Sequence, residues 1–298
     1  MVSVYVHQRG ETTCRDAVDP QWLDPASGAT LWLDLSAPTP DDGRILADVF
    51  HFHPLSVEDA LSVLQFPKIE SYKDYLYLVL HGVDAKRGGS RFATHDIDFF
   101  LGPNYLVTIH DGTFRSVAKL RDVCDRSARI LGEGAVGLMH RIVDSMVDNY
   151  RPVMEEFEKR ITTLEEQAFQ AQDSLVRQVL KLKRDLASMR RVLIPQRDAI
   201  GRLARREFPQ ISDEMAYRFR DVYDHVVRLA EEVILFQDRV TGIIDVNMAT
   251  VSNRLNQVMK VLTVMSTIFL PLTVLTGMWG MNIPLPMLPG GADTMLHA

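Results

Sequence analysis

The chain has 298 residues, of which 46% are hydrophobic and 24% charged, and its formal net charge is -6 at pH 7. This composition is ordinary for a globular domain, and the negative charge argues against nucleic acid as the main partner while it suits the attraction of cations. The two cysteines, Cys14 and Cys124, have neither the spacing of a zinc site nor that of a disulfide framework. The N-terminus has no apolar core of the signal-peptide type, so we expect the bulk of the chain to stay in the cytoplasm.

The first hundred or so residues predict a mixed α/β domain. Short apolar runs bounded by turn residues indicate strands. These runs are Val2–His7, Thr30–Leu35, Pro67–Ser71, Tyr75–His81, Phe92–Leu101 and Tyr105–His110. A threonine, a proline and two aspartates at 39–42 open a helix, and His53–Leu61 predicts a second short helix with Ser56 as its cap.

Two polar groups in this domain could suggest a metal-dependent enzyme. His51 and His53 lie two residues apart on an extended segment, and Asp96 and Asp98 lie beside His95. Neither spacing implies a third ligand, and alternating polar residues are expected on a half-exposed strand. The chain also has no Gly-rich phosphate loop and no nucleophile motif. We therefore predict that it is not an enzyme.

From Thr113 onward the pattern is helical. We predict helices over 114–131, 136–170 and 173–206, with charged faces exposed to water. Pro195 is expected to kink or interrupt the third of them, because proline lacks the N–H that a helix interior needs.

The last helix carries apolar residues at alternating steps of four and three, which is typical of a heptad seam. The seam comprises Val222, Val226, Leu229, Val233, Phe236, Val240 and Ile243, and after a shift of one residue Ile244, Met248, Val251, Leu255, Val258 and Leu262. We expect one continuous helix from Arg220 to Met281, about 90 Å long. We also expect copies of the chain to associate through this seam.

The end of this helix predicts a membrane span, because residues 261–279 contain no charge and are about long enough to cross the hydrocarbon core. Small, polar and flexible residues fall within one arc when residues are placed at 100° intervals. They are Ser252, Asn256, Met259, Thr263, Ser266, Leu270, Thr273 and Gly277. Such an arc faces either water or partner helices. Arg254 and Lys260 precede the span and no basic residue follows it, which places the N-terminal part in the cytoplasm.

The span ends with Trp279-Gly280-Met281-Asn282 and also contains Pro271-Leu272-Thr273. This stretch resembles the first membrane helix of the CorA-type magnesium channel family, whose signature is Gly-Met-Asn at the outer end of that helix. The resemblance extends more loosely over most of the chain.

The resemblance implies an α+β fold, in which a cytoplasmic α/β/α domain is followed by a long stalk helix that continues into the first transmembrane helix. The expected divisions are 1–206 for the cytoplasmic domain, 207–260 for the stalk, 261–282 for the pore helix and 283–298 for the start of an outer loop. A second transmembrane helix is absent from this chain, and we interpret the chain as a truncated form.

The resemblance further implies a homopentameric channel for Mg²⁺, or Co²⁺, in the lipid of the plasma (inner) membrane, multi-pass in its full-length form and gated by cytoplasmic Mg²⁺. The implied selectivity filter is Gly280, Met281 and Asn282, and the implied pore-lining residues are Asn256, Met259, Thr263, Ser266, Leu270, Thr273 and Gly277. Gly280 is expected to allow a backbone turn from which a Cβ is excluded. Regulatory cation ligands are expected at Asp221, Asp144 and Asp84.

Two alternatives stay open at this level. A zinc transporter of the same superfamily shares the Gly-Met-Asn motif, so the sequence does not separate Zn²⁺ from Mg²⁺ as the cation. A membrane-tethered regulatory protein that transports nothing is the second alternative, although the filter motif and the polar arc argue against it.

Overall fold

The structure is a computed structural model that describes residues 1–39, 41–62, 65–83, 93–112, 114–127, 129–170 and 174–280. Its N-terminal part is built on a seven-stranded sheet with the order β2-β1-β3-β7-β6-β5-β4. The strands are β1 (Val2–Gln8), β2 (Glu11–Arg15), β3 (Thr30–Ser36), β4 (Lys68–Ser71), β5 (Leu76–Val83), β6 (Thr94–Leu101) and β7 (Tyr105–His110). Strands β3 and β7 pair in parallel, and all other neighbours are antiparallel.

All six predicted strands are confirmed, and β2 is the one that the sequence did not indicate. It reads Glu-Thr-Thr-Cys-Arg and lies at the edge of the sheet, where it has no buried residue. A polar edge strand lacks the apolar signal on which strand prediction rests.

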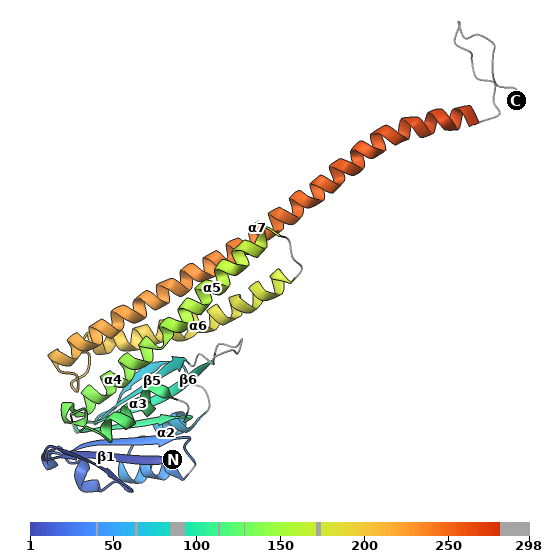
Figure 1. Cartoon of the computed structure of the whole chain (residues 1–298). Helices are drawn as coiled ribbons and strands as arrows, with labels where there is room; N and C mark the ends of the chain where they lie inside the picture. The colour runs from blue at the N-terminus through green and yellow to red at the C-terminus, as the bar shows by residue number, and fades with distance from the viewer. Residues whose placement is uncertain are drawn as a thin grey trace, which may run out of the picture.

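Helices cover both faces of the sheet, so the cytoplasmic part has three layers (Figure 1). One layer holds the short helices η1 (Pro20–Leu23), η2 (Pro25–Ser27), α1 (Asp42–Arg44), η3 (Ile45–Val49) and α2 (Pro54–Leu61), and the other holds α3 (Arg115–Cys124), η4 (Leu131–Glu133) and α4 (Gly134–Asp148). Strand β5 is buried on both sides: Tyr77 and Val79 join the core below α2, whereas Leu78 and Leu80 join the core below α4. The predicted α/β/α domain is confirmed.

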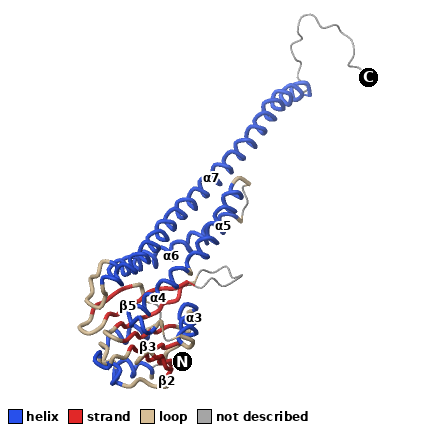
Figure 2. The backbone as a smooth tube through the Cα atoms, turned by 60° about the vertical axis from the view of Figure 1, so that its left-hand side comes forward, coloured by secondary structure: helices blue, strands red, loops and turns tan. Residues whose placement is uncertain are grey.

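Three long helices rise from this domain as a rod: α5 (Tyr150–Ala168), α6 (Leu175–Ala204) and α7 (Asp213–Gly280). In both views α5 and α6 lie beside the first part of α7, and the rest of α7 extends beyond them (Figures 1 and 2). The 68 residues of α7 form a helix of about 100 Å, as a continuous stalk and membrane helix requires.

Some predicted helix bounds were wrong. The helix expected over 136–170 is two helices that meet at Asn149, because Pro152 has no N–H to donate to the carbonyl of Asp148. The helix expected over 114–131 ends at Cys124. Pro195 does not interrupt its helix, since α6 runs through it from Leu175 to Ala204.

The first half of the heptad seam is buried inside the chain, where it packs against α4, α5 and α6. Its buried members are Val222, Val226, Val233, Phe236, Val240 and Ile243. The expectation that this half joins one copy of the chain to another was therefore wrong, because α5 and α6 already cover it. From Met248 onward the seam residues are exposed and stay open to a partner.

Candidate ion pathway and cation site

The apolar end of α7 has no cover from the rest of the described chain, and α7 is the one helix among the described residues that is long and apolar enough to cross a membrane. All seven predicted pore-lining residues lie on this part of α7 and are exposed. They are Asn256, Met259, Thr263, Ser266, Leu270, Thr273 and Gly277. The helix stays continuous through Pro271, so these residues keep the common arc that the sequence predicts.

The threonine hydroxyls of the span donate to backbone carbonyls one turn earlier. Thr263 donates to the carbonyl of Met259 at 2.8 Å, and Thr273 donates to that of Phe269 at 2.8 Å. The hydroxyl protons are thus bound within the helix, whereas the oxygen lone pairs still point outward. A face of this kind accepts hydrogen bonds, which suits the water shell of a hydrated cation.

Pro271 introduces a second acceptor in the middle of the span. Proline has no N–H, so the carbonyl of Thr267 loses its helical donor. A shallow concavity lies at this position and is lined by Leu262, Thr263, Ser266, Thr267, Leu270 and Pro271. Proline and threonine together therefore add hydrogen-bond acceptors to a hollowed, mostly apolar surface in the middle of the helix.

Of the predicted filter residues, Gly280 is the last residue of α7, while Met281 and Asn282 lie outside the described residues. Gly280 does not have a positive φ, and an added Cβ would meet no described atom within 4 Å. The expected backbone turn from which a Cβ is excluded is therefore not found at Gly280. Nothing in the described chain requires glycine there.

The predicted cation ligands Asp144 and Asp221 come together where α4 packs on α7. The pKa of Asp144 is raised above its ordinary value, chiefly by burial. The charges of Asp148 and Asp221 raise it further, whereas those of His140 and His225 lower it. Asp221 itself is exposed, and its carboxylate lies 4.0 Å from Nε2 of His225. The third predicted ligand, Asp84, lies outside the described residues.

The sequence reasoning missed three of these neighbours. His140 and Asp148 lie one helical turn on either side of Asp144, and His225 lies one turn after Asp221, so the four-residue spacing was the available signal. Across the described residues there is no group of three His, Cys, Asp or Glu side chains that could hold a metal ion. Within its described residues, one chain thus brings two acidic groups and two imidazoles near one another, but it does not form a complete set of metal ligands.

The two histidines that sequence analysis considered as a metal pair have local partners instead. Nδ1 of His51 lies 3.3 Å from the carbonyl of Ala47. Nδ1 of His53 accepts a hydrogen bond of 3.2 Å from the backbone N–H of Leu55 and so caps α2. Both rings thus serve the ends of helices.

The second considered group is also used internally. Nδ1 of His95 lies 2.6 Å from the carboxylate of Asp111. Asp96 accepts a hydrogen bond of 3.2 Å from the backbone N–H of Gln65, which ties the loop before β4 to β6. Asp98 is buried below α2.

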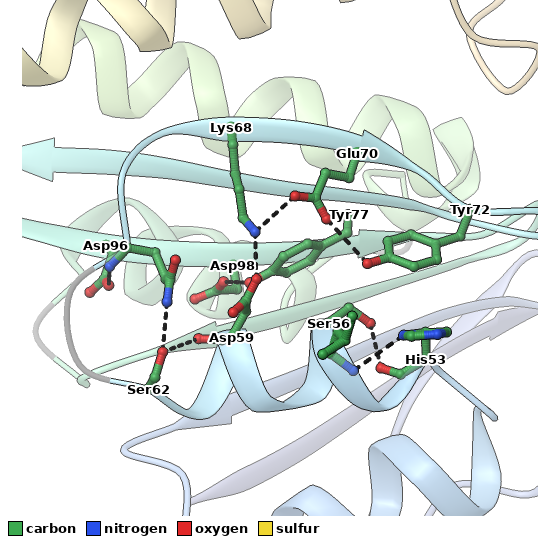
Figure 3. Close-up of polar contacts among 12 residues, drawn as sticks. His53, Ser56, Asp59, Ser62, Lys68, Glu70, Tyr72, Tyr77, Asp96 and Asp98 are labelled. Carbon is green, nitrogen blue, oxygen red and sulfur yellow. Dashed lines mark hydrogen bonds and ion pairs between the residues drawn. The ribbon is translucent and has the colours of Figure 1, made fainter.

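Asp98 belongs to a polar cluster between α2 and the strands β4, β5 and β6 (Figure 3). The hydroxyl of Tyr77 donates to Asp98 at 2.5 Å, and Lys68 binds Asp59 and Glu70 at 2.5 and 2.9 Å. The Lys68 ammonium also lies over the Tyr77 ring, 5.2 Å from its centroid. Burial raises the pKa of Asp98 well above its ordinary value, the hydrogen bond from Tyr77 lowers it, and nearby acids raise it.

This pKa shift predicts a pH-dependent stability. The folded state holds the Asp98 proton more tightly, so its stabilising contribution is complete below the unfolded pKa of about 3.9 and is lost as the pH rises through the folded pKa. Asp98→Asn cannot ionise but still accepts from Tyr77. We expect this variant to lose less stability than the wild type between pH 5 and pH 8, as measured by thermal unfolding. Asp16→Asn, at an exposed position outside this cluster, is the control, and an unchanged pH slope in Asp98→Asn would contradict the prediction.

Comparison with known proteins identifies the family. A family model described as "CorA-like Mg2+ transporter protein" matches residues 27–296. The chain belongs to the CorA family. It is 34% identical over 255 residues to the putative metal ion transporter YfjQ of Bacillus subtilis, which covers 85% of this chain and 79% of that protein. It is 33% identical over 246 residues to the cobalt/magnesium transport protein CorA of Thermotoga maritima, covering 80% of this chain and 68% of that protein.

Solved structures agree on the fold of this CorA-family chain. The CorA magnesium transporter of Methanocaldococcus jannaschii superposes with a TM-score of 0.82 at 20% identity, over 97% of this chain and 89% of that one. The cytoplasmic domain of ZntB from Vibrio parahaemolyticus gives 0.69 at 16% identity, over 85% and 97% of the two chains. CorA-family proteins are transporters, so family membership confirms the prediction that the chain is not an enzyme.

Proposed function

We propose that this chain contributes the cytoplasmic domain and the first membrane helix of a homopentameric channel that carries Mg²⁺, and also Co²⁺, across the plasma membrane. The single observation that carries the proposal is the unbroken helix α7, which joins the buried stalk to an exposed polar arc in the span. Two matched relatives are named cobalt/magnesium transport proteins, which supports these two cations.

The proposed assembly follows from the part of α7 that the chain leaves uncovered. Met248, Val251, Leu255 and Leu262 are exposed apolar residues beyond the end of α5 and α6. Burial of such residues against further copies of the same helix would close a ring, with the polar arc turned to its axis. The N-terminal domain would lie in the cytoplasm, since Arg254 and Lys260 precede the span.

The proposed filter recognises a hydrated ion. Mg²⁺ gives up its water reluctantly, so a pore that passes it is better built to bind the water shell than the bare ion. The Asn282 side chain and the carbonyls of Gly280 and Met281 would supply neutral acceptors to that water. Asn256, Met259 and Leu270 would then form a narrow cytoplasmic half that closes by excluding water.

A flux measurement tests the proposal and its alternatives. Vesicles that contain the full-length protein are loaded with a cation indicator, and uptake of Mg²⁺, Co²⁺ and Zn²⁺ is compared at equal concentration. We expect Mg²⁺ and Co²⁺ to enter faster than Zn²⁺. Faster Zn²⁺ entry would instead support a zinc transporter, and no entry of any of the three ions would support a protein that transports nothing.

Regulation by cytoplasmic Mg²⁺ is proposed to act through Asp221 and Asp144. Without a cation, facing acidic groups repel one another and favour an open arrangement, whereas a bound cation neutralises them and favours a closed one. Asp84 is the first acidic residue in the sequence after strand β5, and it is proposed as an opposing ligand.

We expect Asp221→Ala to weaken this response. Protection of the stalk from protease should require roughly fivefold more Mg²⁺ than in the wild type, because one carboxylate of the site is missing. Asp221→Lys should protect without Mg²⁺, since the ammonium takes the place of the cation. Asp224→Ala, one turn of the stalk away, is the matched control. Equal Mg²⁺ requirements for Asp221→Ala and the wild type would remove Asp221 from the sensor.

A further inference from the structure

On one side the end of strand β5 pairs with β6 through Val83, but on its β4 side it is held by helices instead of by a strand. The neighbouring strand β4 begins at Lys68, whose partner is Val79, so β4 does not reach His81. The backbone N–H of His81 donates instead to Oε1 of Gln196 at 2.8 Å, and its carbonyl accepts from the hydroxyl of Tyr150 at 2.7 Å. Two side chains therefore take the place of the strand residue that would pair with His81.

All three residues are inaccessible to water. His81 is 3% exposed, and both Tyr150 and Gln196 are 0% exposed. A buried backbone group without a partner is costly, so the strand and the two helices depend on each other at this point. We call the group of His81, Tyr150 and Gln196 the sheet–rod joint.

The joint lies at the start of α5 and beside a proline inside α6. Tyr150 is the first residue of α5, directly after the break at Asn149, and Gln196 directly follows Pro195 in α6. A proline inside a helix removes one backbone hydrogen bond and allows bending. Each helix can thus change direction beside the residue that holds the strand.

A further contact continues the joint along the sheet edge. Nη1 of Arg202, six residues after Gln196 in α6, donates to the carbonyl of Ile69 in β4 at 3.0 Å. Helix α6 is therefore bonded to the backbone of both β4 and β5, and it packs along the stalk helix α7. Movement of the sheet edge has a direct mechanical route through α6 to the stalk.

We propose that Tyr150 and Gln196 are positioning residues that couple strand β5 to the stalk, so that a cation-dependent shift of β5 moves α6 and α7 with it. The proposal rests on the proposed cation-regulated channel, since Asp144, a proposed cation ligand, precedes Tyr150 by six residues. The joint itself binds no cation. It transmits the position of the strand.

The test measures the coupling directly with spin labels, which need no transport. One label is placed on the exposed native Cys14 of β2, and the other on Ala187→Cys on the exposed side of α6, while Cys124 is buried. Labelled full-length chains are diluted into unlabelled ones, and the distance between the labels is measured with and without Mg²⁺. Tyr150→Phe removes only the hydroxyl, and Gln196→Leu keeps the size but removes the acceptor. Tyr217→Phe and Gln178→Leu make the same changes at exposed positions and serve as controls.

We expect Mg²⁺ to shift the distance in the wild type and in both controls, and the shift to fall at least about threefold in Tyr150→Phe and in Gln196→Leu. The double variant should be no worse than either single one, because both side chains act on the same residue. Mg²⁺ inhibition of uptake, measured on the same preparations, should need about fivefold more Mg²⁺ in the variants, with uptake at low Mg²⁺ retained.

A wild-type distance that does not respond to Mg²⁺ would overturn the inference, and so would variants that are less heat-stable but shift as much as the wild type. Failure of the proposed function would look different. The vesicles would then show no uptake, while the label distances would still report whether the joint couples sheet and rod.

Discussion

Asn282→Ala is expected to reduce Mg²⁺ uptake by the full-length protein at least about tenfold, because loss of one acceptor to a hydrated ion corresponds to about 1.4 kcal/mol or more. In a ring of identical subunits every copy loses its acceptor at the same level of the pore. Asn282→Asp would restore acceptors but add a ring of charges that holds the ion too firmly, so it should also conduct poorly. Uptake is measured in vesicles at equal protein content.

Two controls separate the filter from general damage. Asn253→Ala makes the same change in α7, before the span and outside the polar arc, and Thr276→Ser keeps the hydroxyl at a position off the arc. Both should retain wild-type uptake. Normal uptake by Asn282→Ala would show that the filter assignment is wrong. Gly280→Ala is informative beside it, since within the described chain an added Cβ has space, and a loss of uptake would point to neighbours from other copies.

Phe236→Ala is expected to destabilise the rod by about 3–5 kcal/mol, the usual cost of removing a buried phenylalanine side chain. Phe236 is 4% exposed in the core between the long helices. Its neighbour Leu235 is 62% exposed on a face of α7 turned away from this core, so Leu235→Ala should change the free energy of unfolding by no more than about 0.5 kcal/mol. Denaturant unfolding of the two variants in detergent measures the difference.

This pair also tests which surface of the stalk the chain uses for itself. If Val222 to Ile243 pack within one chain, Phe236→Ala lowers stability but leaves the mass of the assembly unchanged. Dissociation of the assembly by Phe236→Ala, without loss of stability, would show that this half of the seam lies at the subunit interface.

The sequence predicted the sheet well because its central strands β3, β5 and β7 are buried on both faces, whereas it missed β2, an edge strand made of polar residues. Helix bounds were predicted less well where a single residue sets them. Pro152, for example, divides one predicted helix into two helices that meet at Asn149. Pro195 shows the opposite case, since packing on both sides keeps α6 helical through it.

The limits were different for the candidate sites. Periodicity found both the heptad seam and the polar arc of α7, but it did not say whether a seam faces its own chain or another copy, because both remove the same residues from water. The cation cluster was found only in part. His140 lies one turn before Asp144 on the same helix, whereas only the packing of α4 on α7 brings His225 near Asp144.

The threonines of the membrane span have a consequence for how the protein is made. Thr263, Thr267, Thr273 and Thr276 all donate their hydroxyl protons to carbonyls of their own helix, at 2.7–2.9 Å. A hydroxyl with no partner is costly in the bilayer core, so these internal bonds lower the cost of placing a single helix in lipid. A newly made chain can therefore enter the membrane alone and wait there, and the search for its sister chains becomes a later, two-dimensional event in the plane of the bilayer.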